Sequence, residues 1–361
     1  MNDHIQLDKK KVRIGVLGAG HIAQAAHFDS CKKAYNIELL AICDVAEDLL
    51  EKVSSMHGVI KKYSNYDLML NDEDIDAVII ATDDSFHVPM SIKALEAGKH
   101  VLCEKPIGIN VEEVEELKKV VTSSKKIFQV GHMKRFDAGL QAAKSFIDNE
   151  MGDIIALKAW YCDSTHRYEV TNAVQPFILK SSKSLKPKKN PKDNLQKYYM
   201  LAHGSHLIDL TRYFGGEIIA VRSRLLFKAE IWCWFIEVEF ANGSLGHLDL
   251  TIAVRMDWNE GFQIYGKNGS VIGKIYNPWL YKTSDVDIFK ESLGTSYRVL
   301  GADGHFYRRQ IESFADVILQ KKIFKGASVD DGVASVRAMI AIARSIESQN
   351  WVKLDSVSGG L

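Results

Sequence analysis

Two glycines and an aspartate near the start of the chain have the spacing of a phosphate-binding turn. Gly18 and Gly20 follow a short apolar run, a small residue comes three positions later, and Asp44 closes a second apolar run. In this pattern the first glycine permits a sharp turn, and the second lets a pyrophosphate approach the backbone. The amides that open the next helix, at His21 and Ile22, would face the phosphates. The pattern therefore predicts a dinucleotide site.

Asp44 also bears on which dinucleotide binds. Its carboxylate can accept both hydroxyls of an adenine ribose, and it would repel a 2′-phosphate. Val45 follows it, and no Lys or Arg occurs before Lys52. We therefore expect NAD rather than NADP. The order of strand, turn, helix, strand and acid favours this site over a glycine-rich loop of some other α/β protein.

Lys105 follows a buried apolar run and lies between Glu104 and Pro106. When a hydride leaves an alcohol carbon, the hydroxyl proton must leave as well. A lysine can accept that proton if burial lowers its pKa, and in its charged form it can polarise the carbonyl in the reverse reaction. The other interpretation is a structural ion pair between Glu104 and Lys105.

His206 and Asp209 lie three positions apart on a predicted helix, so they share a face. A histidine titrates near neutral pH and suits proton transfer. The alternative is a helix histidine whose ring is satisfied by a backbone carbonyl.

Two further groups of side chains could contact a ligand rich in hydroxyl groups. Three residues follow a predicted strand end, although the arginine among them could instead brace the domain interface. Two others follow the first strand of the second domain, where a polar loop could bind a sugar or simply be solvated. A tryptophan could cover a sugar ring or belong to the core. These residues are Met133, Lys134, Arg135, Asp163, Arg167 and Trp258.

The first part of the chain alternates apolar strands with amphipathic helices. Such alternation predicts a doubly wound parallel sheet of the Rossmann type, which we assign to residues 1–133. Ligands of these sheets bind at the carboxyl ends of the strands. The residues expected at those ends, in one crevice, are Gly18, Asp44, Thr82, Lys105 and His132.

Residues 134–361 have a different pattern. Apolar runs at 220–227, 232–240, 244–254 and 261–266 are joined by turns at 241–243 and 267–269, which predict antiparallel hairpins. Helices are expected at 137–149, 198–214, 305–320 and 330–348. This is an α+β domain on an open, mostly antiparallel sheet, and we expect it to bind substrate and to join subunits into a homodimer or homotetramer.

Composition narrows the class of protein. A chain of 361 residues suggests two domains, and a formal net charge of zero gives no field that would attract nucleic acid or an anionic membrane. No apolar run approaches the ~20 residues of a membrane span, and the first residues lack a signal core. Five scattered cysteines without C-x-x-C spacing predict reduced thiols in a cytoplasmic protein and no metal site.

The stretch 180–197 is rich in lysine and contains two prolines. It could be a solvated excursion of the chain. It could also be a lid whose lysines attract an acidic sugar or sugar phosphate, because it directly precedes the predicted helix that carries His206.

Several motifs together resemble the Gfo/Idh/MocA oxidoreductase family, which includes inositol and sugar dehydrogenases. They are the glycine-rich turn, Ala81-Thr82 with His87, the segment from Ala94 to Pro106 with its Glu104-Lys105-Pro106, Val130 to Phe136, and Gly204 to Asp209. The resemblance implies that Thr82, His87, Glu104 and Lys105 contact the cofactor, that Lys105 and His206 are catalytic, and that the substrate is a small molecule.

One position departs from the family pattern. Many sugar and inositol dehydrogenases have an aspartate four residues before the histidine, and this chain has Ala202 there, followed by His203. Either His203 replaces the carboxylate in binding substrate, or the substrate lacks the hydroxyl that the carboxylate would bind.

The sequence thus predicts an NAD-dependent dehydrogenase that oxidises a secondary hydroxyl of a sugar, sugar derivative or cyclitol. Two alternatives stay open. One is a glycosidase that uses the nicotinamide transiently, and the other is a non-catalytic regulator that binds a dinucleotide and a protein partner.

Overall fold

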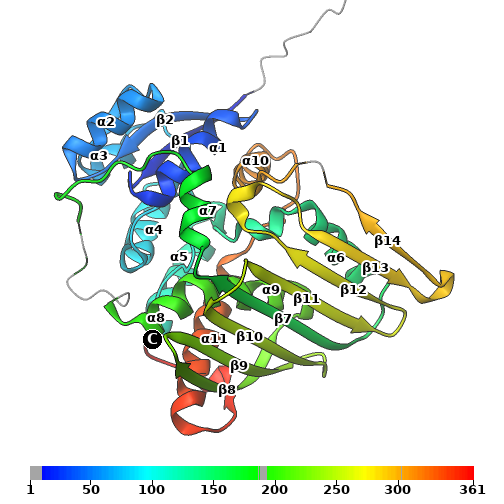
Figure 1. Ribbon diagram of the computed structural model, residues 1–361. Coiled ribbons are helices and arrows are strands. Elements are labelled where there is room, and N and C mark those ends of the chain that lie inside the picture. The colour runs from blue at the N-terminus through cyan, green and yellow to red at the C-terminus, as the bar shows by residue number, and fades with distance from the viewer. Residues whose placement is uncertain (1–9, 186, 188–192, 302) are drawn as a thin grey trace, which may run out of the picture.

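The computed structural model describes residues 10–185, 187, 193–301 and 303–361, without the side chains of Arg167, Tyr168 and Val170. In this part of the chain the strands form two sheets, one of six strands and one of nine. Figure 1 shows the first sheet, with its helices, beside one end of the second.

The first sheet is parallel throughout and has the strand order β3-β2-β1-β4-β5-β6. This is the order of a classic dinucleotide-binding sheet, so the predicted Rossmann topology is confirmed. All four residues of β4 are buried, as expected for a parallel sheet covered on both faces. The strands are β1 (Val12–Leu17), β2 (Ile37–Cys43), β3 (Lys61–Tyr63), β4 (Ala77–Ile80), β5 (His100–Cys103) and β6 (Phe128–Val130).

Helices connect these strands, as the alternation predicts. Helical backbone begins at His21, directly after the glycine-rich turn, and passes through one π-helical turn before α1. Asn110 caps α5 by accepting a hydrogen bond from the Glu113 amide. The helical segments are η1 (Ala23–His27), α1 (Phe28–Lys33), α2 (Glu47–His57), α3 (Tyr66–Leu70), η2 (Asp84–Phe86), α4 (His87–Glu96), α5 (Val111–Ser124) and η3 (Met133–Phe136).

The second sheet has the order β14-β13-β12-β11-β7-β10-β9-β8-β15. All neighbours are antiparallel except β7 and β10, which run parallel, so the predicted open and mostly antiparallel sheet is confirmed. The strands are β7 (Ile154–Ser164), β8 (Ile218–Lys228), β9 (Ile231–Phe240), β10 (Leu245–Val254), β11 (Asn259–Gly266), β12 (Gly269–Ile275), β13 (Asp285–Lys290), β14 (Thr295–Val299) and β15 (Val352–Lys353).

Both predicted hairpins form, between β9 and β10 and between β11 and β12. The polar stretch after the first strand is different from the prediction. The sequence predicts a loop at Asp163, but this residue lies inside β7, where it pairs with Ile252 of β10. Arg167, predicted in the same loop, begins the helix α7. The partner strand extends β7 beyond the point where its own apolar pattern ends.

Three helices of the second domain, α6, α9 and α11, lie on one face of the nine-stranded sheet (Figure 1). The other face is open and exposes apolar side chains, among them Phe235 and Leu245, which are 51% and 60% exposed. The helical segments are α6 (Ala138–Asn149), α7 (Arg167–Val174), α8 (Leu195–Tyr199), η5 (Met200–Gly204), α9 (Ser205–Gly215), η6 (Pro278–Leu280), η7 (Glu291–Leu293), α10 (Phe306–Ile318), α11 (Val329–Ser348) and η8 (Leu354–Ser356).

Two helices near the C-terminus join the domains. Phe314 of α10 packs in the apolar cluster beneath β1, and Asn36 donates a hydrogen bond to Asp316 of α10 over 2.8 Å. The helix α11 packs against both α5 and β8. The predicted domain boundary after residue 133 falls inside η3. Among the described residues, no helix combines the length and the apolar character needed to cross a bilayer.

Candidate active site

The glycine-rich turn has the shape that a dinucleotide requires. Gly18 has φ +96°, and a Cβ atom there would lie 2.6 Å from the carbonyl oxygen of Ala81, so only glycine fits. At Gly20 a Cβ atom would meet nothing within 4 Å, which leaves open space beside the backbone. The helix starts at the next residue, where its first amides have no carbonyl within the helix to bind. These features fit a pyrophosphate.

Asp44 is bound to the same turn. One carboxylate oxygen accepts from the Ala19 amide and the other from the Ala46 amide, both over 2.8 Å. Because a carboxylate offers about four lone-pair sites, it can hold the turn and still accept hydroxyl groups of a ribose. Val45 beside it is exposed.

Of the remaining predicted cofactor residues, Thr82 follows β4, Glu104 and Lys105 follow β5, and His87 begins α4. His87 is buried, with Nδ1 2.7 Å from the Pro106 carbonyl oxygen and Nε2 3.3 Å from that of Thr82. It therefore braces the two turns against each other. Glu104 is buried and lies 2.9 Å from Nε2 of His27. Burial by itself would raise the pKa of Glu104, but His27 and then Lys105 outweigh it and lower that pKa.

Lys105 reaches from the first domain to the second. Its amide donates to Oε2 of Glu104 over 3.1 Å, and its Nζ donates to the main-chain carbonyl of Ala202 over 3.0 Å. Ala202 stands where many sugar and inositol dehydrogenases have the aspartate. The backbone at this position therefore supplies an oxygen to the lysine, although the side chain does not.

His206 lies in a cluster of aromatic rings. Its ring stacks on that of Tyr161, with centroids 6.2 Å apart and planes 7° apart, and it meets His132 edge-on at 6.3 Å. Burial, followed by the charges of Lys105 and Lys134, holds the pKa of His206 well below its usual value. The imidazole is therefore neutral at physiological pH, and because its protonated form is disfavoured, it suits passing a proton on rather than keeping it.

Tyr161 is at the centre of this cluster, and sequence reasoning missed it. Its hydroxyl lies 3.3 Å from Nδ1 of His203, whose Nε2 lies 3.6 Å from Oδ2 of Asp163. Nζ of Lys134 lies over the Tyr161 ring at 4.5 Å from its centroid, and Trp258 packs against the ring at 5.2 Å. The period of two along β7 places Tyr161 on the same face as Asp163, which is the signal that could have identified it.

Lys134 forms a buried ion pair with Glu260, a second residue that sequence reasoning missed. Burial lowers the pKa of Lys134 and raises that of Glu260, while the attraction between the two charges opposes both changes. The two residues are 126 positions apart, and nothing in the local sequence around either points to the other.

Met133 and Arg135, which the sequence predicts in the crevice, are buried by packing and do not line it. Met133 packs against Ala26, Phe306 and Tyr307. Arg135 makes a two-pronged ion pair with Asp209, at 2.7 Å for its shortest contact, and a second pair with Asp331 at 3.1 Å. Arg135 therefore braces η3, α9 and α11 within the second domain, and not the interface between the two domains. The side chain of Arg167 lies outside the described part of the structure.

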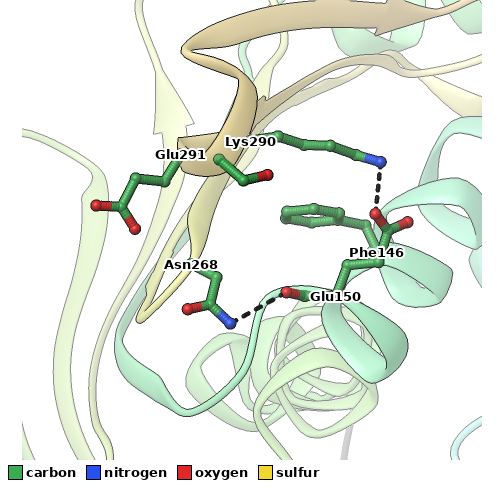
Figure 2. Close-up of a pocket in the computed structure, with 6 residues that line it drawn as sticks. Phe146, Glu150, Asn268, Lys290 and Glu291 are labelled. Atoms are coloured by element: carbon green, nitrogen blue, oxygen red, sulfur yellow. Dashed lines mark hydrogen bonds and ion pairs between the residues drawn. The ribbon is translucent and has the colours of Figure 1, made fainter.

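A surface cavity of about 380 Å³ lies at the opposite end of β7 (Figure 2). An ion pair of 2.5 Å between Lys290 and Glu150 crosses it, and Asn268 donates to the Glu150 carbonyl over 3.4 Å. None of the residues predicted for the site lines this cavity. Its lining residues are Phe146, Glu150, Asn268, Lys290, Glu291 and Ser292.

Comparison with known proteins agrees with this architecture. Residues 12–132 match the "Oxidoreductase family, NAD-binding Rossmann fold" description of the Gfo/Idh/MocA family. Residues 194–354 match its "Oxidoreductase family, C-terminal alpha/beta domain".

Individual relatives extend over nearly the whole chain. The myo-inositol 2-dehydrogenase of Thermotoga maritima is 24% identical over 96% of this chain and 100% of its own length. An oxidoreductase of Desulfitobacterium hafniense, described as NADPH-dependent, has a TM-score of 0.79 at 18% identity, covering 96% of this chain and 98% of its own. A levoglucosan dehydrogenase in complex with NADH and L-sorbose has a TM-score of 0.77 at 20% identity, covering 96% and 100%. Both domains of the family are present in order, and the chain belongs to the Gfo/Idh/MocA oxidoreductase family.

Proposed function

We propose that this protein is an NAD-dependent dehydrogenase that oxidises a secondary hydroxyl of a sugar, sugar derivative or cyclitol. The observation that carries the proposal is the contact between Lys105 and Ala202, which holds the lysine ammonium at η5, where its charge acts on His206. A bound NAD would supply the hydride acceptor at the ends of β4 and β5.

The chain's own residues would handle the proton. An ammonium has three N–H donors, and Lys105 uses one of them on the Ala202 carbonyl. Either deprotonated Lys105 or neutral His206 can accept the hydroxyl proton as the hydride leaves. Charged Lys105 can polarise the carbonyl oxygen in the reverse reaction.

The polar groups around Tyr161 suit a substrate with several hydroxyl groups. Asp163 and His203 lie close together beneath the Tyr161 hydroxyl, and Trp258 offers an aromatic edge beside it. Position 202 carries no carboxylate that could bind substrate hydroxyls. We propose that Asp163, His203 and Tyr161 bind those hydroxyls instead. The dehydrogenase names among the relatives, myo-inositol and levoglucosan, support this class of substrate.

Asp44 supports NAD over NADP. Its carboxylate lies against the turn at the end of β2, where a 2′-phosphate would meet a negative charge. One structural neighbour was solved with NADH, whereas another is described as NADPH-dependent, so the preference must be measured on this protein.

The test is absorbance at 340 nm with NAD or NADP against a panel of sugars, cyclitols and glycosides. The proposal expects NADH to accumulate with a free sugar or cyclitol. Release of free sugar from a glycoside without net NADH would instead indicate the glycosidase. Binding of NADH without turnover on any member of the panel would indicate the regulator.

A further inference from the structure

Residues 175–181, which follow α7, pass from the second domain onto the first. In Figure 1 this green segment leaves α7 and runs across the blue helices and strands. We call residues 175–181 the strap. Hydrogen bonds join it to two places on the first domain, Gln24 beside the glycine-rich turn and Asp48 in the first turn of α2.

Gln24 ties the strap to the glycine-rich turn. Its Nε2 donates to the Ala19 carbonyl over 2.7 Å and to the Leu179 carbonyl over 3.0 Å. Its Oε1 accepts from the Leu179 amide over 2.9 Å. The side chain is only 4% exposed, so water does not compete for these bonds. One amide therefore sets the distance between the dinucleotide turn and a segment 155 positions away.

The second anchor lies on the other side of the turn. Ser181 donates to the carboxylate of Asp48, with its Oγ 2.7 Å and 3.0 Å from the two oxygens. The side chain of Leu179, whose backbone forms the first anchor, packs on the same apolar cluster as Ile22. The strap therefore spans from the helix that follows the turn to the helix that follows Asp44. These are the two helices that flank the pyrophosphate and adenosine positions in this fold.

Lys180 lies between the two anchors, near the first residue of the helix. Burial lowers the pKa of His21, a hydrogen bond with the Gln175 side chain opposes this, and the positive charge of Lys180 adds to it. The exposed Lys180 side chain therefore acts electrostatically on His21, at a helix N-terminus that is suited to an anion.

We propose that the strap completes the dinucleotide site from the second domain, with Gln24 as the positioning residue and Lys180 as a positive charge for the pyrophosphate. The inference rests on the proposed dinucleotide, but it does not depend on the substrate. It follows that NADH leaves only when the strap separates from the turn, so that contacts made by the second domain govern the dissociation rate.

The test measures NADH release from the full-length protein by stopped-flow fluorescence, with energy transfer from tryptophan to NADH. Gln24→Leu keeps the size of the side chain and removes all three bonds, and we expect release to be about tenfold faster or more. Leu179→Pro removes the amide donor from the strap itself, in a segment without helix or strand, and should have a similar effect. Lys180→Ala should weaken NADH binding and reduce its dependence on salt.

Matched variants separate this role from a purely structural one. Gln24→Glu keeps the acceptor for the Leu179 amide but places a carboxylate oxygen against the Ala19 and Leu179 carbonyl oxygens, so its release rate should be at least as fast as that of Gln24→Leu. Lys33→Ala, at an exposed pair with Asp29 on the same helix, should release NADH at the wild-type rate. In the wild type, NADH should slow tryptic cleavage after Lys180, and this protection should be lost in Gln24→Leu.

Release within twofold of the wild-type rate in both Gln24→Leu and Leu179→Pro, at unchanged melting temperature, would overturn the proposal. These measurements need no substrate, so a failure to find any oxidised sugar leaves them intact. If the wild-type protein did not bind NADH at all, the proposed function and this inference would both be wrong.

Discussion

Nζ of Lys105 donates a hydrogen bond to the main-chain carbonyl of Ala202 over 3.0 Å, across 97 positions of the sequence and from one domain to the other. The acceptor is a backbone atom, so the contact does not depend on the side chain at position 202. The lysine is therefore held in place although position 202 has no polar side chain. The contact also makes the position of the lysine depend on η5.

Lys105→Met should abolish most turnover and keep most of the affinity for NADH. Methionine keeps the length of the side chain and removes both the proton acceptor and the charge, so we expect kcat to fall by about 10³-fold. NADH affinity should fall far less than kcat, because the glycine-rich turn and Asp44 remain in place. Steady-state kinetics and NADH titration measure the two effects. Lys62→Met, at an exposed ion pair with Glu51, is the control and should keep full activity.

The lowered pKa of His206 predicts how the free energy of unfolding depends on pH. Burial, followed by Lys105 and Lys134, holds its folded-state pKa well below 6.5, whereas the unfolded chain protonates near 6.5. The unfolded state therefore binds more protons in that window, and the free energy of unfolding falls as pH drops from 6.5 through the folded pKa. His206→Gln should lose less stability between pH 7 and 5 than the wild type does, as measured by urea unfolding. A larger loss in the variant would mean that the folded pKa is raised.

Asp44→Ala should weaken the preference for NAD. The variant loses the acceptor for ribose hydroxyls and the repulsion of a 2′-phosphate, and the Ala19 amide loses its partner. We expect KM for NAD to rise about tenfold or more, and the ratio of kcat/KM between NAD and NADP to fall by a larger factor. Asp67→Ala, whose carboxylate pairs with Lys93 on the surface, should leave the ratio unchanged. An unchanged ratio in Asp44→Ala would remove Asp44 from cofactor selection.

Arg135→Met should destabilise the fold. Asp209 is 3% exposed, and removing its guanidinium partner leaves a buried carboxylate, at a cost of about 3–5 kcal/mol. Arg135→Lys should not restore stability, because an ammonium cannot make the two-pronged contact. Urea unfolding measures both variants. Arg298→Met breaks an exposed pair with Asp287 and should cost no more than about 1 kcal/mol. Equal losses at the two sites would contradict this account.

We propose that the open face of the nine-stranded sheet joins subunits. It exposes Leu226, Phe235 and Leu245 on the neighbouring strands β8, β9 and β10. A contiguous exposed apolar patch of this kind often marks a protein–protein interface. Phe235→Glu combined with Leu245→Lys should lower the mass measured by light scattering to that of a monomer at micromolar concentration. Ile60→Glu, at a site 90% exposed on the first domain, should leave the mass unchanged. A monomeric wild-type protein would end this proposal.

The local sequence was sufficient for much of the architecture. The parallel sheet, the glycine-rich turn and the hairpins at 241–243 and 267–269 follow from apolar periods and turn residues, and all of them form. These features depend on residues only a few positions apart, so a short stretch of sequence is enough to predict each of them. The end of β7 shows where this information stops, because its pairing with β10, and not its own pattern, extends it to Ser164.

The candidate site depended on contacts between distant segments. Lys105 could be identified from its motif, but its acceptor at Ala202, the stacking of Tyr161 on His206 and the pairing of Lys134 with Glu260 could not. Each of these contacts joins residues whose local patterns are independent of each other. The sequence determined which side chains stand at strand ends and helix faces. Only the packing of the two sheets and of α10 and α11 decided which of them meet, because burial, and the shifts in pKa that it causes, exist only once distant segments exclude water together.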